Sequence, residues 1–389
     1  MQGLIGPLKE LAEFEELCKN KKKDVGMIRV CGCVNSQKSH MMYALGDGCK
    51  YKVIACSSET KAKQIYEEYR FLDSNTYLYP AKDFLFYQAD IRSKELVKQR
   101  MEGIQAVLSG EPVTVVTSLD GFMDHLAPKE SIAEKVLKIQ NDSVLKLDEM
   151  AEKLSVIGYD REVQVEGPGQ FAVRGGILDI YPLTEELPVR IELWGDEVDS
   201  IRTFDVESQR SIENLMDIVI YPAVEFPQNG EKGVSFLDYF PPEDTILFLD
   251  EPVRLVERGQ NIEDEFMEAQ KKRLESGYDL EEEEAKIFPV TEILKKINCY
   301  SSIGFYALGM KCKGLEVRES YEIQAKSVNP YNNSFEMLTQ DLKRLKRNGY
   351  RVILLSGSRT RAKRLAEDLR DYNLSSYYSE DLDREVKPG

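Results

Sequence analysis

Histidine is scarce in this sequence, with two residues in 389, and tryptophan occurs once. The seven cysteines are odd in number and irregularly spaced, which argues against the disulfide framework of a secreted domain. Cys31 and Cys33 are separated by a single residue, closer than the pair of a zinc knuckle, and no second cysteine pair follows. We therefore expect no metal site and interpret the cysteines as buried thiols.

Long apolar runs are also missing. No stretch reaches the ~18 consecutive apolar residues of a membrane-spanning helix. The first residues lack the apolar run of a signal peptide, and Leu8, Leu11, Phe14 and Leu17 recur instead at helical spacing. These absences predict a cytoplasmic protein.

Positive charge is in deficit. The formal net charge is −16 and the isoelectric point is about 4.9, while the 42% hydrophobic and 31% charged residues are typical of a globular protein. Nucleic-acid binding draws much of its free energy from lysine and arginine that neutralise phosphates. The charge therefore favours a protein surface over DNA as the main partner.

Strand-like and helix-like segments alternate through the first 130 residues. Strands are predicted at 27–30, 52–55, 76–79 and 113–117, and helices at 40–45, 58–71 and 93–108. This alternation predicts an α/β fold, in which helices cover both faces of a parallel sheet.

The pattern changes near residue 131 to short strands separated by glycine, proline and acidic turns. These strands are predicted at 163–165, 170–173, 176–180, 189–194 and 198–204. They indicate an antiparallel α+β insertion. The α/β pattern returns near residue 226, with a strand at 245–249 and a highly charged helical stretch at 263–286.

A last segment begins near residue 319. It contains predicted helices at 334–348 and 360–369 around a strand at 351–355, and nothing caps this unit before the end, so we expect the natural chain to continue. The predicted domains are thus 1–130 and 226–318 (two parts of one domain), the insertion 131–225, and the start of a small α/β domain at 319–389.

A degenerate phosphate-binding loop follows the first strand. Gly32 to Ser39 has the frame G-x-x-x-x-G-K-[ST], but Gln37 stands where the second glycine belongs. That glycine lets backbone N–H groups curl round the phosphates. Lys38 and Ser39 keep the residue types that contact phosphate and magnesium.

The strand at 245–249 leads into Asp250 and Glu251, an arrangement typical of the magnesium-binding acid of nucleotide hydrolases. Two half-motifs in the correct order indicate RecA-type ancestry. Because the phosphate loop has lost its second glycine, we predict that this site is a remnant without hydrolytic activity.

The strand 189–194 alternates, so its apolar residues share one face while Arg190, Glu192 and Trp194 share the other. Arg174 directly follows strand 170–173, and by the same alternation it faces away from Phe171 and Val173. Exposed aromatics beside arginines are typical of interface hot spots. An alternative is that Trp194 stacks on Arg174 or Arg190 within the domain.

Two long motifs carry a family resemblance. They are GQFAVRGGILDIYP from Gly169 to Pro182 and RIELWGDEVDSIR from Arg190 to Arg202, followed by Phe204-Asp205. This region resembles the UvrA-interacting domain that UvrB shares with the bacterial transcription-repair coupling factors.

Three features favour the coupling factors over UvrB. The stretch from Asp205 to Ser211, DVESQRS, resembles their version of the domain's end, and the phosphate loop is degenerate whereas UvrB keeps an intact one. The segment from Leu78 to Tyr87 leads straight into a helix, without the aromatic-rich DNA-gripping hairpin of UvrB.

The resemblance implies a degenerate RecA-like, helicase-derived domain interrupted by a UvrA-binding insertion. By motif position, Arg174, Arg190 and Trp194 fall where family members contact UvrA, although the aromatic there is often phenylalanine. Full-length members translocate on double-stranded DNA with ATP and magnesium and bind RNA polymerase. The parts responsible are missing from these residues, so we expect neither catalytic residues nor a cofactor here.

Two alternatives remain open. One is a UvrB-like nucleotide-binding helicase fragment that uses Lys38, Ser39 and Asp250. The other is DNA binding through basic residues of the last segment, although acidic residues are interspersed among them. Those basic residues are Lys343, Arg344, Lys346, Arg347, Arg359, Arg361, Lys363 and Arg364.

Overall fold

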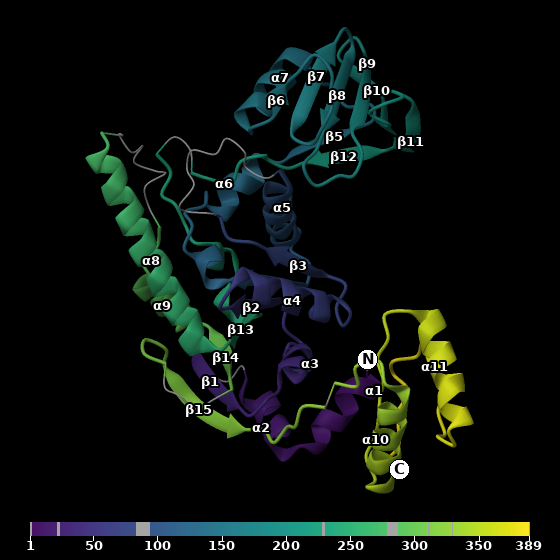
Figure 1. Ribbon diagram of the computed structural model, residues 1–389. Coiled ribbons are helices and arrows are strands. Elements are labelled where there is room, and N and C mark those ends of the chain that lie inside the picture. Colours follow the sequence, from purple (N-terminus) through teal and green to yellow (C-terminus); the bar gives the residue numbers. More distant parts are fainter. Residues whose placement is uncertain are drawn as a thin grey trace.

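The computed structural model describes residues 2–388 except 22–23, 83–93, 228–229, 278–286, 308, 310–311 and 329. Figure 1 shows an α/β domain in the middle, a separate β-rich unit above it, and a pair of helices beside the amino-terminus. None of the described helices is both long and apolar enough to cross a membrane.

The central domain is built on a parallel sheet with the strand order β15-β1-β14-β13-β2-β4-β3. Its strands are β1 (Gly26–Cys31), β2 (Tyr51–Cys56), β3 (Thr76–Tyr79), β4 (Val113–Ser118), β13 (Thr245–Asp250), β14 (Ser301–Tyr306) and β15 (Val317–Glu322). The predicted parallel α/β sheet is confirmed.

Helices cover both faces of this sheet. One face packs against α2 (Ala12–Asn20), α3 (Asn35–Leu45) and α4 (Glu59–Arg70), and the other against α5 (Lys94–Leu108), α8 (Pro252–Glu275) and α9 (Val290–Ile297). Neighbouring strand residues alternate between the two cores, as Val53 and Ile54 do. Burial on both faces explains why these strands are apolar without alternation.

The insertion carries a second sheet, with the order β11-β10-β9-β8-β7-β6, and a separate pair of β5 with β12. Its elements are β5 (Leu137–Gln140), α7 (Leu147–Val156), β6 (Asp160–Arg161), β7 (Gln170–Arg174), β8 (Ile177–Tyr181), β9 (Val189–Trp194), β10 (Glu197–Phe204), β11 (Ser211–Leu215) and β12 (Asp217–Ile220). Neighbouring strands are antiparallel except β6 and β7. The sheet and α7 enclose a core of their own.

One predicted strand of the insertion is wrong. Residues 163–165 form a bend, and the pairing with β7 occurs at Asp160–Arg161 instead. The backbone N–H groups of Glu166 and Gly167 donate to Oε1 of Gln170, at 2.9 and 3.0 Å. This side-chain bridge turns the chain directly after the predicted strand.

The insertion returns to the α/β domain beside a buried arginine of α5. Arg100 is fully buried and donates from Nε to Oε1 of Glu225 and from Nη2 to Oδ2 of Asp124, each at 2.7 Å. Its Nη1 donates to the carbonyl of Pro80, and its guanidinium lies 4.4 Å from the ring centroid of Tyr79. This cluster, the Arg100 junction, ties the returning segment to the core.

The carboxy-terminal unit consists of α10 (Phe335–Arg347) and α11 (Arg359–Asp371), which share a small apolar core. Among the described residues, 351–355 pair with no other strand, so the strand predicted there is not formed. Ile353 and Leu354 are partly exposed, because no neighbouring strand covers them within the described part of the chain.

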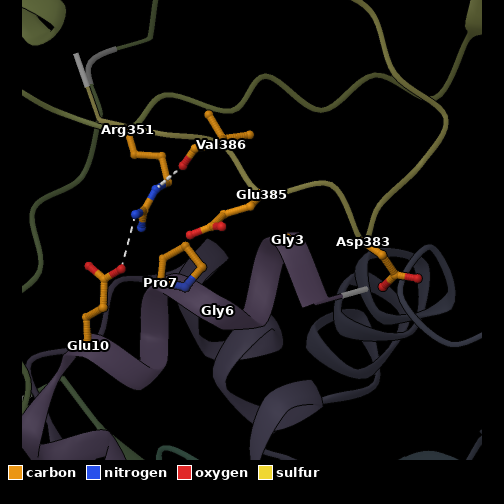
Figure 2. Close-up of a pocket in the computed structure, with 8 residues that line it drawn as sticks. All are labelled: Gly3, Gly6, Pro7, Glu10, Arg351, Asp383, Glu385 and Val386. Atoms are coloured by element: carbon orange, nitrogen blue, oxygen red, sulfur yellow. Dashed lines mark hydrogen bonds and ion pairs between the residues drawn. The ribbon is translucent and has the colours of Figure 1, made fainter.

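The two ends of the chain meet at a pocket. Arg351 donates to Oε1 of Glu10 at 3.1 Å and to the carbonyl of Val386, and Gly3 donates to the carbonyl of Leu382 at 2.9 Å. Figure 2 shows Arg351 reaching from the carboxy-terminal unit to Glu10, with Pro7 beside the contact. These contacts place the last unit against α1 (Gln2–Ile5) and the 3₁₀ turn Gly6–Glu10.

Two predicted features lie partly outside the described residues: residues 83–87 of the segment from Leu78 to Tyr87, and residues 278–286 of the charged helix. The described part of the predicted helix belongs to α8, which begins earlier, at Pro252.

Candidate protein-binding face and remnant nucleotide site

The two half-motifs of the phosphate site meet at the carboxyl ends of β1 and β13. Lys38, in the first turns of α3, is buried, and its Nζ lies 2.7 Å from both Oδ1 of Asp250 and Oε1 of Glu251. Burial acts to lower the pKa of Lys38, but the carboxylates of Asp250 and Glu251 together outweigh it, so the pKa is raised and the ammonium stays charged. Ser39 donates from Oγ to Oε2 of Glu68 at 2.7 Å. The groups that would contact phosphate and magnesium are thus already paired within the protein.

The main chain at Ile323 also packs directly against the start of the phosphate loop. Ile323, just after β15, donates its N–H to the carbonyl of Cys31 at 2.8 Å. Gly32 has a φ of +84°, and a Cβ built on it would lie 2.1 Å from the carbonyl oxygen of Ile323. Glycine is therefore required here by a close backbone approach, independently of any nucleotide.

In this structure the ammonium of Lys38 is not open to a nucleotide phosphate. A phosphate would have to displace Asp250 and Glu251, which already hold Lys38. Gln37 adds a side chain whose Oε1 is buried without a hydrogen-bond partner in the described part of the chain. Lys38, Asp250 and Glu251 thus form an ion cluster within the protein.

The second group of sequence-predicted residues lies on the insertion (Figure 1), on the sheet face opposite α7. In β9, Val189 and Ile191 are buried in the insertion core, whereas Trp194 is 85% exposed. The predicted alternation of this strand is confirmed. Trp194 pairs with Glu197 across the β9–β10 hairpin, and Glu197 bridges to Val144, which is 79% exposed. Directly paired residues point to the same side of a sheet, so Val144 and Trp194 are exposed on the same side, with Glu197 between them.

Both predicted arginines bind one carboxylate of the same chain. Arg190 donates from Nε to Oδ1 of Asp179 at 2.7 Å and from Nη2 to Oδ2 at 2.9 Å, and Arg174 donates from Nη2 to Oδ2 at 2.6 Å. The register explains this convergence, since Asp179 lies opposite Arg190 on β9 and opposite Ala172 on β7. Reasoning from the sequence missed Asp179. The available signal was a carboxylate in the middle of the apolar strand ILDIY.

The two arginines differ in exposure. The side chain of Arg174 is 44% exposed and that of Arg190 is 14% exposed. Arg190 also lies 4.4 Å from the ring centroid of Phe204. The stacking partner of Arg190 is therefore Phe204, and Arg174 is the guanidinium that faces solvent.

The basic residues of α10 and α11 are partly neutralised. Arg344 pairs with Asp341, and Arg359 lies 3.3 Å from Glu380. Lys363 lies 5.2 Å from the ring centroid of Tyr378. Internal partners of this kind argue against a continuous basic surface for DNA.

Comparison with known proteins agrees with the geometry of the insertion. The sequence profile of the UvrB interaction domain matches residues 137–226, which run from the start of β5 to just beyond β12. A transcription-repair-coupling factor of Bacillus subtilis is 25% identical over an alignment of 430 residues, and this alignment takes in 95% of the present chain. The chain is similar in sequence to the transcription-repair-coupling factors.

Other coupling factors match more closely over a shorter region. That of Staphylococcus epidermidis is 38% identical over 154 residues, and that of Haemophilus influenzae is 32% identical over 159 residues, about 40% of this chain in each case. The chain spans 36% of the length of the Bacillus subtilis coupling factor. It is similar to the amino-terminal region of these coupling factors, and its residues 137–226 match the UvrB interaction domain.

Proposed function

We propose that this chain is a recruitment module that binds UvrA and brings it to RNA polymerase stalled at a lesion, in transcription-coupled nucleotide excision repair. The UvrB interaction domain at 137–226 supports this proposal. The observation that carries it is the exposure of Trp194, at 85%, at the end of β9, on the same sheet face as the Arg174–Asp179–Arg190 cluster. An exposed indole and partly desolvated guanidiniums on one face are residue types enriched in binding hot spots.

The same proposal extends to the full-length protein. We place it in the bacterial cytoplasm as an ATP-dependent DNA translocase that displaces RNA polymerase, with ATP, magnesium, RNA polymerase and double-stranded DNA bound by parts outside these residues. The fragment itself is proposed to have no enzymatic activity.

The first test is calorimetric titration of the chain with UvrA. We expect the parent to bind and Trp194→Ala to bind about 30-fold more weakly, because truncating a hot-spot aromatic costs about 2 kcal/mol. Trp194 is exposed in the free chain, so the substitution leaves the insertion folded.

The matched control is Val163→Ala, which truncates an 87% exposed apolar residue next to β6, at the far edge of the same sheet. It should bind UvrA as the parent does. Equal affinities for the parent and Trp194→Ala would place the contact elsewhere on the insertion, and failure of the parent to bind would remove the proposed function.

The competing proposal is a nucleotide-binding helicase fragment, which the convergence of Lys38 and Asp250 favours. Because Lys38 is already paired with two carboxylates, we expect titration with ATP and magnesium to show no saturable binding. An intact phosphate-loop ATPase titrated in the same buffer provides the positive control. Saturable binding of labelled ATP by this chain, removed by excess unlabelled ATP, would contradict the interpretation that the site no longer binds nucleotide.

A further inference from the structure

Asp179 occupies the centre of the proposed binding face without being available to a partner. It lies in the middle of β8 and is 1% exposed. Both of its carboxylate oxygens accept hydrogen bonds from arginines, Oδ1 from Arg190 and Oδ2 from Arg190 and Arg174. A buried carboxylate is tolerated in a protein when it is paired and hydrogen-bonded in this way.

The guanidinium of Arg190 contacts three residues of the insertion: Asp179, Gln209 and Phe204. Besides its two bonds to Asp179, its Nη2 donates to Oε1 of Gln209 at 2.8 Å, and its guanidinium lies over Phe204. Gln209 is itself fixed, because it has a φ of +58° and its Nε2 donates to the carbonyl of Val206 at 2.8 Å. The hydrogen bond to Asp179 is the main factor that raises the pKa of Arg190. Arg190 is therefore fixed before any partner arrives.

Arg174 is held by Asp179 alone among the hydrogen bonds of the described residues, through a single Nη2 contact. A guanidinium has five N–H donors, so four remain for a partner. One carboxylate faces two guanidiniums, which leaves the cluster with one net positive charge on the sheet face that also carries Trp194. The complementary surface offers a carboxylate to the cluster and an apolar site to the indole.

We propose that Asp179 is a positioning residue for UvrA binding: it holds Arg174 and Arg190 in one preorganised arrangement, with Arg174 directed to a carboxylate of the partner. This inference rests on the proposed function. Preorganised side chains lose less conformational freedom on binding, so the complex dissociates more slowly. Without Asp179, the two guanidiniums repel each other and Arg174 loses its anchor.

The test is the kinetics of UvrA binding by Asp179→Asn, an isosteric change that removes the negative charge. We expect the dissociation rate to rise about tenfold, in line with the loss of charge-assisted hydrogen bonds. The association rate should not fall, because the face gains positive charge toward an acidic partner. A purely structural role would reduce the fraction of active protein but leave the dissociation rate of the bound molecules unchanged.

The matched control is Asp160→Asn, which makes the same change at an exposed position of β6 in the same sheet, and its dissociation rate should equal that of the parent. A double-mutant cycle supplies the second measurement. If Asp179 acts through Arg174, Asp179→Asn should change the dissociation rate clearly less in an Arg174→Ala background than in the parent.

A spectroscopic measurement without UvrA separates the two proposals. The Nε–Hε resonance of Arg190 should be protected from exchange in the free parent and lose that protection in Asp179→Asn. If the parent binds UvrA but Asp179→Asn leaves the dissociation rate unchanged, or the cycle is additive, the positioning role is overturned while the proposed function stands. If the parent does not bind UvrA, the proposed function fails and the positioning role fails with it, even when the resonance shows the arginine held.

Discussion

Arg100→Met should lower the free energy of unfolding by about 3–5 kcal/mol, because it leaves the carboxylates of Glu225 and Asp124 buried without their main partner. Methionine fills much of the same space but donates no hydrogen bond. It also removes the contact of the guanidinium with Tyr79. Lys82 lies 2.9 Å from Asp124 and 3.1 Å from Glu225, so it retains part of the stabilisation. Urea unfolding followed by circular dichroism measures the loss.

The control for this substitution lies on the same helix. Lys98→Met removes a lysine that is 28% exposed and 3.9 Å from Glu102, so little change is expected. Comparable destabilisation by both substitutions would mean that α5 responds to methionine in general, and the Arg100 junction would lose its assigned role.

The stability that the Arg100 junction contributes should also depend on pH. Burial acts to raise the pKa of Glu225, but Arg100 and Lys82 outweigh it and hold that pKa at about 2, against 4.5 for the free side chain. A depressed carboxylate pKa stabilises the fold above the unfolded-state pKa, and the contribution disappears as the pH falls from about 4.5 to 2. The stability difference between parent and Arg100→Met should therefore shrink over that interval. A constant difference would show that the lost stability comes from packing alone.

The consequence for function lies in the linkage between the two units. The carbonyl of Glu225 accepts from the N–H of Ala127 at 2.8 Å, so the chain leaving the α/β domain and the chain returning from the insertion are hydrogen-bonded to each other. Arg100, on α5, hydrogen-bonds to the side chain of Glu225 and so ties these two chain segments to the α/β domain. We expect the UvrB interaction domain to keep its own core when the junction is weakened, because that core shares no residue with the α/β cores.

The α/β domain could be predicted because its strands are buried on both faces and its helices carry apolar residues at helical spacing. Two helix starts were also readable from the sequence: Ser58 of α4 and Ser334 of α10 were each predicted as the first helical residue, and each is the N-cap, with its Oγ accepting from a backbone N–H three residues later. Periodicity and capping are local properties, so the sequence reports them directly.

Features that depend on strand register were not predictable in the same way. Asp179 meets Arg174 and Arg190 only because β7, β8 and β9 pair in one particular register. The strand predicted at 351–355 has the right composition, yet pairing requires a neighbour that the local sequence cannot specify. In residues 163–165, the apolar–polar–apolar order Val-Gln-Val is that of a strand, yet Val163 is exposed and Val165 buried, because the chain is bent at 163–164.

Lys38→Met should be the second strongly destabilising change, costing about 3–5 kcal/mol in the free energy of unfolding. The substitution leaves the buried Asp250 carboxylate without its ion pair, and Glu251 loses one of its partners. Glu251 has a φ of +55° and accepts from the N–H of Ala307 at 2.9 Å, so this strained residue depends on the same cluster. Thermal and urea unfolding of the purified variant measure the effect.

A matched control and a rescue distinguish the ion cluster from a general loss of lysine. Lys272→Met removes an exposed lysine paired with Glu268 on α8 and should leave stability unchanged. Adding Asp250→Asn and Glu251→Gln to Lys38→Met should restore part of the loss, since no unpaired carboxylate then remains in the cluster. If the triple variant is less stable than Lys38→Met, the carboxylates stabilise the fold by contacts other than Lys38. Such a result would contradict the view that the former phosphate-binding lysine now serves as their counter-ion.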